Sequence, residues 1–270
     1  MVYQCHYPTR SMETARGAKR SPFHDRLAAR GAYFRDVSGW EGADWYAPAG
    51  ESATVDALSW GRQPWFDWWA AEHRAARENV ICMDMSFMSK FLVQGRDAGR
   101  LLERLSANHV NGDSGLITYT QWLNEGGTLE ADLTVTKLDD ERFWVVASDT
   151  AHRHAETWMR RHVTDDMHAF VSDMTSGFAQ VNVQGPRSRD LLQTLTSADL
   201  SNDAFPFRTA REIAGVTAGC GNGNFCPQAA VTRDQMAVFL LLAKEGEGFT
   251  PPACTAPVFA DVPCSIPFAP

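Results

Sequence analysis

The stretch Val93-Gln94-Gly95, followed by Leu101-Leu102 and Leu105-Ser106, is repeated later in the chain with the same internal spacing. The second copy reads Val183-Gln184-Gly185, Leu191-Leu192 and Leu195-Thr196. In each copy a short apolar run ends at a glycine, which is typical of a strand that stops at a turn. The leucines that follow have the spacing of the buried face of a helix. The repeat therefore predicts two strand–turn–helix units.

Two further segments of β-type composition lie between the copies, at 133–138 and 143–146. The turn-like Asp139-Asp140-Glu141 joins them, so we expect an antiparallel hairpin. Apolar and aromatic spacing also predicts helices over 65–78 and 151–163. Repeated strand–helix units around antiparallel pairs favour an α+β fold with duplicated ferredoxin-like (split βαβ) subdomains.

Composition limits the classes of partner. The chain has 270 residues, 44% of them hydrophobic, and a net charge of −8. This acidic balance gives no electrostatic reason to expect nucleic acid or an anionic membrane as a partner. The longest apolar run, 237–243, is too short to cross a bilayer, and the first residues do not resemble a signal peptide. We therefore expect a cytoplasmic location.

The composition changes abruptly after Ile213. Residues 1–213 hold all nine tryptophans, whereas residues 214–270 hold none and carry Cys220, Cys226, Cys254 and Cys264. We read 1–60 as an irregular prelude, 61–213 as the main domain, and 214–270 as a small cysteine-rich module containing one helix. The cysteine spacings do not fit the common zinc motifs, so we favour local disulfides over metal.

Candidate ligand-binding chemistry gathers around Tyr119 and Asp132. Tyr119 lies on a predicted strand that runs into the Gly126-Gly127 turn, and Asp132 opens the next strand. A carboxylate just past such a turn is well placed to meet a ligand. From composition alone, however, the simpler interpretation is that Asp132 caps the turn and Tyr119 packs.

Several short motifs occur in order along residues 1–213. They are Glu72–Arg77, Asp84–Phe91, Gly95–Ala98, Leu105–Asn108, Tyr119–Thr120 through Gly126-Gly127 to Asp132-Leu133, and Val183–Pro186. This series resembles the folate-binding aminomethyltransferase family, which comprises the T-protein of glycine cleavage and the C-terminal halves of sarcosine and dimethylglycine dehydrogenases. The prelude motifs His6–Pro8, Ser21-Pro22 and Gly39–Trp45 resemble the dehydrogenase branch.

The resemblance implies tetrahydrofolate as the cofactor, and a methylated glycine derivative or another aminomethyl donor as the small-molecule amine substrate. By motif position Asp132 would be the catalytic carboxylate, and Tyr119 the aromatic neighbour that lines the folate cleft. Asn108 and Met88 lie in matching segments and are further candidates for that cavity. A turn Asn and a packed Met are the favoured alternative for these two.

The chain also departs from the family pattern. The glycine-rich, glutamate-containing segment that anchors the pterin, and the barrel subdomain after it, do not follow Arg208 here. No flavin domain precedes the matched region, so we expect no FAD in this chain and a separate flavin-containing oxidoreductase as a candidate partner. The resemblance thus implies a truncated domain, for which loss and retention of one-carbon transfer are both open.

The segment 214–270 is similar to the S-layer-homology repeats of bacterial surface proteins. The match rests on Gly215–Gly221, Cys226-Pro227, Val231–Leu240 and Phe259–Pro263. It leaves two alternatives open: cell-surface attachment through this repeat, and a non-functional chimera of two incomplete parts.

Two weaker candidates for a functional role are a group of histidines and a cysteine. His152, His154 and His162 lie on the predicted helix 151–163. We see no acidic partner fixed four residues beyond them, so we interpret them as a solvated helix face and expect no metal site. Cys82, between Ile81 and Met83, is expected to be a buried apolar side chain.

Overall fold

The computed structural model describes residues 13–54 and 60–213. The predicted tail module, its helix and its four candidate disulfide cysteines lie outside these residues. The chain divides into two compact units, whose described parts are 13–185 with 208–210, and 186–207 with 211–213. Of the helices within the described residues, none has the length and apolar character that a bilayer crossing requires.

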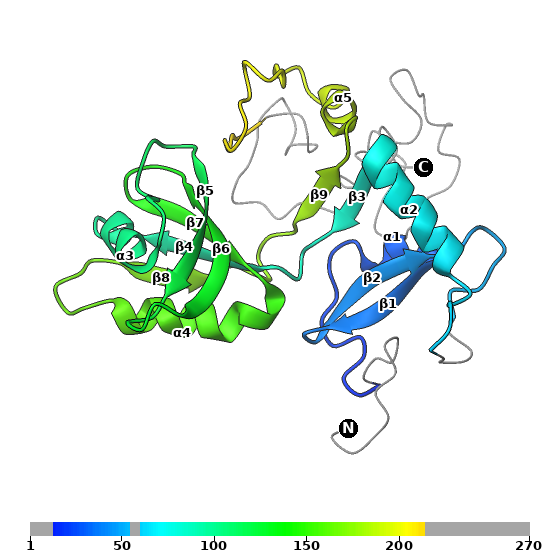
Figure 1. Ribbon diagram of the computed structural model, residues 1–270, viewed down its shortest axis with the longest axis horizontal. Coiled ribbons are helices and arrows are strands. Elements are labelled where there is room, and N and C mark those ends of the chain that lie inside the picture. Colours follow the sequence, from blue (N-terminus) through cyan, green and yellow to red (C-terminus); the bar gives the residue numbers. More distant parts are fainter. Residues whose placement is uncertain (1–12, 55–59, 214–270) are drawn as a thin grey trace, which may run out of the picture. The chain divides into compact units, whose positions relative to one another are not determined.

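Helices separate groups of two or three consecutive strands along the chain (Figure 1). The helices are α1 His24–Ala29, α2 Phe66–Glu78, α3 Ala98–Leu105, α4 His152–His162 and α5 Ser188–Gln193, with a 3₁₀ turn at Asp149–Ala151. The strands are β1 Ala32–Val37, β2 Trp40–Tyr46, β3 Ile81–Asp84, β4 Ser89–Gln94, β5 Ile117–Leu123, β6 Leu129–Lys137, β7 Arg142–Ala147, β8 Phe170–Asp173 and β9 Val181–Gln184.

The largest sheet holds five antiparallel strands in the order β5-β6-β7-β4-β8. The predicted β6–β7 hairpin, helix α4 and both strand–turn–helix units are confirmed. Strand β4 of the first copy lies between β7 and β8, whereas β9 of the second copy pairs with β3. The mixed α/β architecture is therefore as expected, while duplication of a complete ferredoxin-like subdomain stays a prediction.

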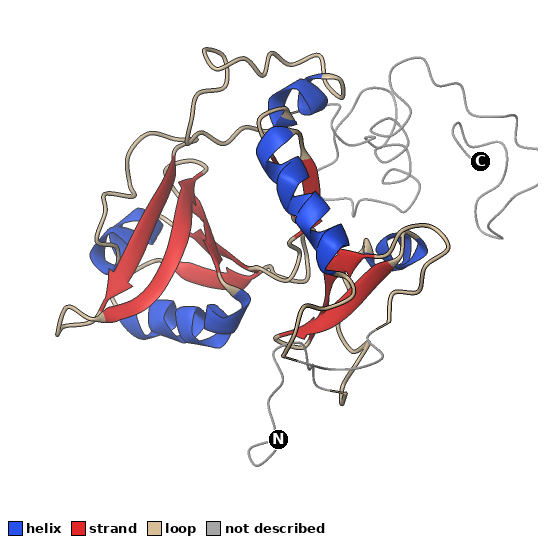
Figure 2. Ribbon diagram, turned by 45° about the vertical axis from the view of Figure 1, so that its right-hand side comes forward, coloured by secondary structure: helices blue, strands red, loops and turns tan. Residues whose placement is uncertain are grey.

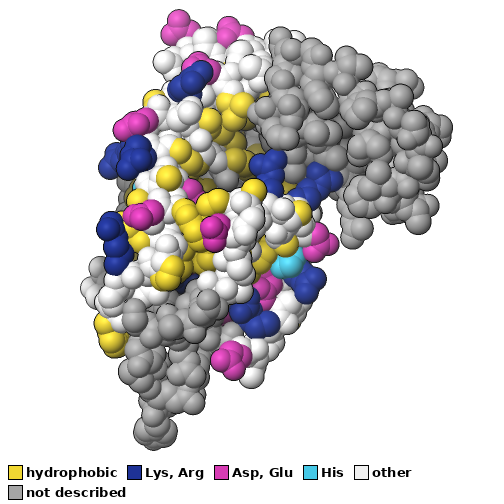
Figure 3. Space-filling view, turned by 90° about the vertical axis from the view of Figure 1, so that its right-hand side faces the viewer, with side chains coloured by type: hydrophobic (Ala, Val, Ile, Leu, Met, Phe, Trp, Pro, Cys, Tyr) yellow, Lys and Arg dark blue, Asp and Glu magenta, His cyan; other side chains and the backbone are white. Residues whose placement is uncertain are grey.

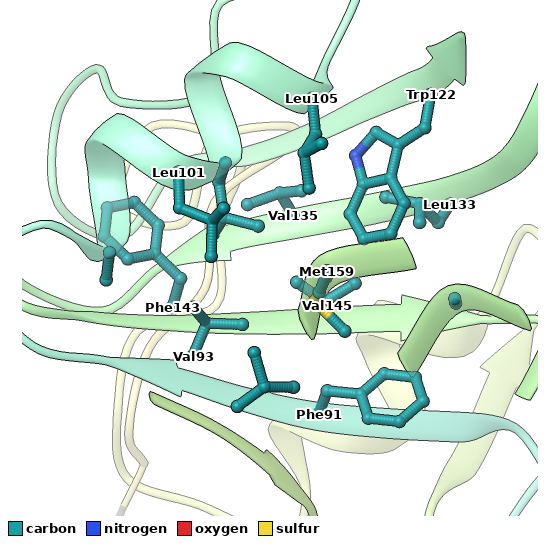
Figure 4. Close-up of a cluster of buried hydrophobic side chains, with 14 of the residues drawn as sticks. Phe91, Val93, Leu101, Leu105, Trp122, Leu133, Val135, Phe143, Val145 and Met159 are labelled. Carbon is teal, nitrogen blue, oxygen red and sulfur yellow. The ribbon is translucent and has the colours of Figure 1, made fainter. Parts of the chain in front are cut away.

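One face of the five-stranded sheet is covered by α3 and α4, which lie on the same side of it (Figure 2). Alternate residues of β4, β6 and β7 point into this layer and are buried. The helices contribute the leucines of α3 together with Ala155 and Met159 of α4. Figure 4 shows these side chains interdigitating between sheet and helices. The residues between them on each strand therefore belong to the opposite, open face.

The expectation that 1–60 is irregular is wrong for its described part, because β1 and β2 form an antiparallel hairpin. Ser38 and Gly39 at its turn both have positive φ, 50° and 86°, which suits a tight two-residue hairpin. Trp45 of β2 is 1% exposed and stacks on Trp65, at 5.8 Å between ring centroids. The sequence predicted a loop for the aromatic segment Gly39–Trp45, because its glycines interrupt the apolar pattern.

Figure 3 shows the face on which α2 lies in Figure 1. Apolar side chains gather in the middle of this face, with acidic and basic side chains around them.

Helix α2 confirms the helix predicted over 65–78, although it has no buried residue. Its aromatic side chains pack with Trp65, which precedes the helix, and Trp65 and Trp69 meet edge to face at 6.3 Å.

Candidate functional site

Tyr119 and Asp132 meet on the open face of the five-stranded sheet. They lie on the neighbouring strands β5 and β6, where Tyr119 pairs with Thr134 and Gln121 with Asp132. The core-facing neighbours Thr118 and Thr120 are buried, so Tyr119 points the other way and is 54% exposed. Its hydroxyl donates a hydrogen bond of 2.7 Å to Oδ2 of Asp132. The hairpin thus places a phenol and a carboxylate together at the surface.

This hydrogen bond fixes the roles of both groups. The acceptor Asp132 raises the pKa of the Tyr119 hydroxyl, since the proton is shared with a carboxylate. Tyr119 therefore stays a neutral donor at neutral pH, and its aromatic ring is available for stacking. A carboxylate oriented by one neighbour keeps acceptor capacity for an N–H group or a developing cation.

Asn108 supports the same strand from the turn that follows α3. Its side-chain Nδ2 donates to the carbonyl oxygen of Tyr119 at 2.8 Å. Its backbone N–H donates to Oγ1 of Thr120 at 3.0 Å. Both contacts bind the turn to β5, so Asn108 sits beside Tyr119 and helps to fix the position of its backbone.

A pocket with a volume of about 420 Å³ opens beside Tyr119, and Asp132 is not among its lining residues. Its lining residues are Asn108, His109, Thr118, Tyr119 and Arg208. His109, Thr118 and Arg208 were not predicted from the sequence. Arg208 carries no local signal, because it reaches the pocket only through a return of the chain to the edge of β5, where Ile117 N–H donates to its carbonyl at 2.8 Å.

Met88 lies in the turn between β3 and β4 and is half-buried. Ser89 pairs with Ala147, which pairs with Leu133, so the register places Met88 at the same end of the sheet as Asp132. Strand β7 lies between them, which corresponds to about 10 Å between backbones. Met88 does not line the pocket beside Tyr119. Its carbonyl instead accepts a 2.7 Å hydrogen bond from Nζ of Lys90.

The prediction that the helix histidines have no acidic partner four residues beyond them is wrong for His152. Glu156 does lie four residues after His152, and the ligand atoms of His152, Glu156 and Asp173 fall within 4.8 Å of one another. His152 is hydrogen-bonded to Asp173 at 2.8 Å, and Arg160 pairs with Glu156 at 3.1 Å. The sequence alone did not reveal this cluster because Asp173 joins it from β8.

His154 is exposed, as expected for a solvated helix face, and its Nε2 lies 2.7 Å from Glu130 of β6. Cys82 is exposed, so its expected burial is wrong. It lies on β3, which belongs to the two-stranded β3–β9 sheet and has the burial pattern of a surface strand.

Comparisons with known proteins agree with this architecture. The chain is 37% identical over 212 residues to 4-methylaminobutanoate oxidase (formaldehyde-forming) of Paenarthrobacter nicotinovorans, covering 78% of this chain and 26% of that protein. It is 26% identical over 244 residues to mitochondrial sarcosine dehydrogenase of Mus musculus, covering 77% of this chain and 27% of the relative. The chain thus spans about a quarter of the length of these curated relatives.

Among solved structures, the glycine cleavage system aminomethyltransferase T from Bartonella henselae superimposes with a TM-score of 0.54 and 21% identity. The match covers 71% of this chain and 46% of that structure, and it shows a shared fold. The model of the family described as "GCVT N-terminal domain" matches residues 23–220, which is most of the chain. This protein therefore belongs to the GCVT N-terminal domain family.

Proposed function

We propose that the open face around Tyr119 and Asp132 binds tetrahydrofolate and serves one-carbon transfer from a methylated amine. The observation that carries this proposal is the 2.7 Å hydrogen bond to the exposed carboxylate of Asp132 from the hydroxyl of Tyr119, which lines a pocket of about 420 Å³. That volume lies in the range of small-molecule sites. An exposed aromatic ring, an oriented carboxylate and a pocket suit a flat heteroaromatic ligand that carries N–H groups.

In this proposal Asp132 is the catalytic residue. Its free carboxylate lone pairs accept an N–H of the bound pterin and stabilise positive charge on the incoming methylene donor. Tyr119 positions that carboxylate and offers a ring for stacking, and Asn108 fixes the strand that carries Tyr119. Tetrahydrofolate itself supplies the nucleophilic nitrogen that takes up the one-carbon unit.

The names of the relatives support a proposal for the substrate class. Their names specify oxidation of 4-methylaminobutanoate and sarcosine, both secondary methylamines with a carboxylate, and the structural neighbour is an aminomethyltransferase. We propose an N-methylated amino acid as the methylene donor. Because oxidation of such an amine requires an electron acceptor, we further propose that a flavin-containing oxidoreductase supplies the oxidised amine.

The experiment is a titration of tetrahydrofolate into the full chain, followed by tryptophan fluorescence. Trp144 is a suitable reporter, since it lies on the open face opposite Thr136 of β6. We expect saturable quenching, weakened about tenfold in Asp132→Ala by loss of a charge-assisted hydrogen bond.

Asp140→Ala is the matched control, because it removes an exposed carboxylate from the turn after β6, where Asp140 pairs with Lys137 at 3.1 Å. Its affinity should equal that of the wild type. Absence of quenching in the wild type, or equal affinity in both variants, would refute the assignment. Turnover with a methylated amine and a flavoprotein partner then decides between retained and lost activity.

A further inference from the structure

Arg208 is held at the edge of the sheet by both its backbone and its side chain. Residues 208–210 return to β5, with a bridge between Leu116 and Thr209 and a 2.7 Å bond from Ala210 N–H to the Gly115 carbonyl. Ile117 N–H donates to the Arg208 carbonyl at 2.8 Å, and Nε of Arg208 donates back to the Ile117 carbonyl at 3.1 Å. The arginine is therefore fixed beside the first residue of β5.

The backbone of Arg208 has a left-handed conformation, with φ of 63°. Such a conformation is strained for a residue with a Cβ, and strained residues concentrate at functional sites. Among the described residues the other two non-glycine cases are Ala15 and Ser38, which lie in turns as Arg208 does. Arg208 differs from them because it lines a pocket.

The charge of Arg208 is available to a ligand. Its one recorded side-chain hydrogen bond uses Nε, which leaves the two terminal nitrogens of the guanidinium, and no carboxylate pairs with it anywhere in 13–54 or 60–213. The neighbouring His109 is occupied differently, since its Nδ1 lies 2.7 Å from Glu103. A free, oriented guanidinium fork that lines a pocket favours a carboxylate or phosphate.

The distance along β5 between Arg208 and Asp132 distinguishes two candidate ligands with carboxylates, an N-methylglycine and tetrahydrofolate. Arg208 is fixed at Ile117, whereas Asp132 pairs with Gln121, four residues further along the strand. Four residues of strand span about 13 Å. The amine and carboxylate of an N-methylglycine are separated by one carbon, so such a ligand cannot reach both ends. Tetrahydrofolate can, because its aminobenzoyl group separates the pterin nitrogens from the glutamate carboxylates.

We propose that Arg208 forms an anion subsite that binds a glutamate carboxylate of tetrahydrofolate, with the pterin end at Asp132. This inference rests on the proposed function and adds to it the orientation of the ligand. It also explains why a bulky residue is kept in a left-handed conformation that glycine would adopt more readily.

The test compares two pterins, tetrahydrofolate and tetrahydropteroate, which lacks the glutamate. In the wild type tetrahydrofolate should bind about tenfold more tightly. In Arg208→Gln this advantage should disappear, with tetrahydropteroate affinity unchanged, and the salt dependence of tetrahydrofolate binding should weaken. Arg104→Gln, which removes a cation from the helix-covered side, should leave both affinities as in the wild type.

Arg208→Gly guards against a folding artefact. Glycine accepts the left-handed backbone, so this variant should be as stable as the wild type and should still lose the preference for tetrahydrofolate. The proposal is overturned if Arg208→Gln weakens both pterins equally, weakens neither, or instead raises the KM of a carboxylated amine substrate. Failure of both pterins to bind the wild type would overturn the proposed function itself, and this inference with it.

Discussion

Gly95 and Gly185 occupy the same turn in the two copies of one motif, and both have a φ of 124°. A methyl group on either would overlap a backbone carbonyl oxygen, that of His168 for Gly95 and that of Asn79 for Gly185. The surroundings of the two copies differ greatly. Helix α3 buries five residues against the five-stranded sheet, whereas α5 has no buried residue. Short-range sequence therefore determines the turn, while burial depends on which strands lie alongside.

The sharpest test of this difference is alanine at each glycine. Gly95→Ala should lower the free energy of unfolding by about 3 kcal/mol or more, because the strained turn connects a central strand to a buried helix. Gly185→Ala should lower it by about half as much, since the only strand paired with β9 in the described structure is β3. Urea denaturation followed by circular dichroism measures both losses.

Hydrogen exchange localises these effects. In Gly185→Ala the amides of β3 and β9 should lose protection while those of β4 to β7 keep theirs. Equal losses of stability in the two variants, or loss of protection throughout the chain in both, would mean that the copies are energetically equivalent despite their different burial.

The helices give the next largest contrast. Leu101 of α3 is fully buried, and its counterpart Leu191 of α5 is only partly buried. Leu101→Ala should cost about 3 kcal/mol through lost burial and a residual cavity, and Leu191→Ala about 1 kcal/mol or less. The same urea titrations measure this pair. A cost for Leu191→Ala that matched Leu101→Ala would contradict the smaller contribution of α5 to stability.

The repeat illustrates which features the sequence predicts. The turns, the β6–β7 hairpin and helix α4 depend on neighbouring residues, so periodicity and turn composition were sufficient for them. The proximity of Tyr119 and Asp132 likewise follows from one tight hairpin. Their roles in folate chemistry remain predictions, because they rest on resemblance.

Features built from distant segments were not predictable in this way. Arg208 reaches the pocket after the chain leaves the sheet and returns, and Asp173 joins His152 from another strand. The β1–β2 hairpin was missed for a different reason, since its glycines interrupt the apolar pattern and its packing comes from the rings of Trp65 and Trp68 against Trp45.

A third contrast concerns Lys90 of β4, whose counterpart in the second copy is Gln180. Lys90 is buried, and its Nζ donates to the carbonyls of Ser86 and Met88 at 2.9 and 2.7 Å. Burial disfavours the charged form and lowers its pKa to about 8. The folded chain therefore binds fewer protons than the unfolded chain between this value and the ordinary lysine pKa, so stability rises with pH there.

Lys90→Gln gives the first copy the residue of the second and removes this titration. Between pH 8 and pH 10 the wild type should gain about 2 kcal/mol relative to the variant, as measured by urea denaturation at each pH. The comparison with the variant is needed because burial also raises the pKa of Tyr46 to about 12, which lowers stability above pH 10 in both proteins. Parallel pH profiles would show that Lys90 is solvated.

The smallest expected effect lies at the helix starts, where Asp97 precedes α3 and Arg187 precedes α5. The Asp97 carboxylate accepts the backbone N–H of His168 at 2.9 Å, which lowers its pKa, and Arg96 lowers it further. A carboxyl group with a depressed pKa stabilises the fold above its unfolded pKa, and that contribution is lost as the pH falls through the folded value. Asp97→Asn should therefore lower the urea midpoint at pH 6 and have less effect below about pH 4.

Arg187→Gln at the start of α5 is the control. This substitution changes no carboxylate, so it should shift the urea midpoint equally at both pH values. An equal shift for Asp97→Asn at the two pH values would show that the charge of Asp97 does not stabilise the first copy through this contact.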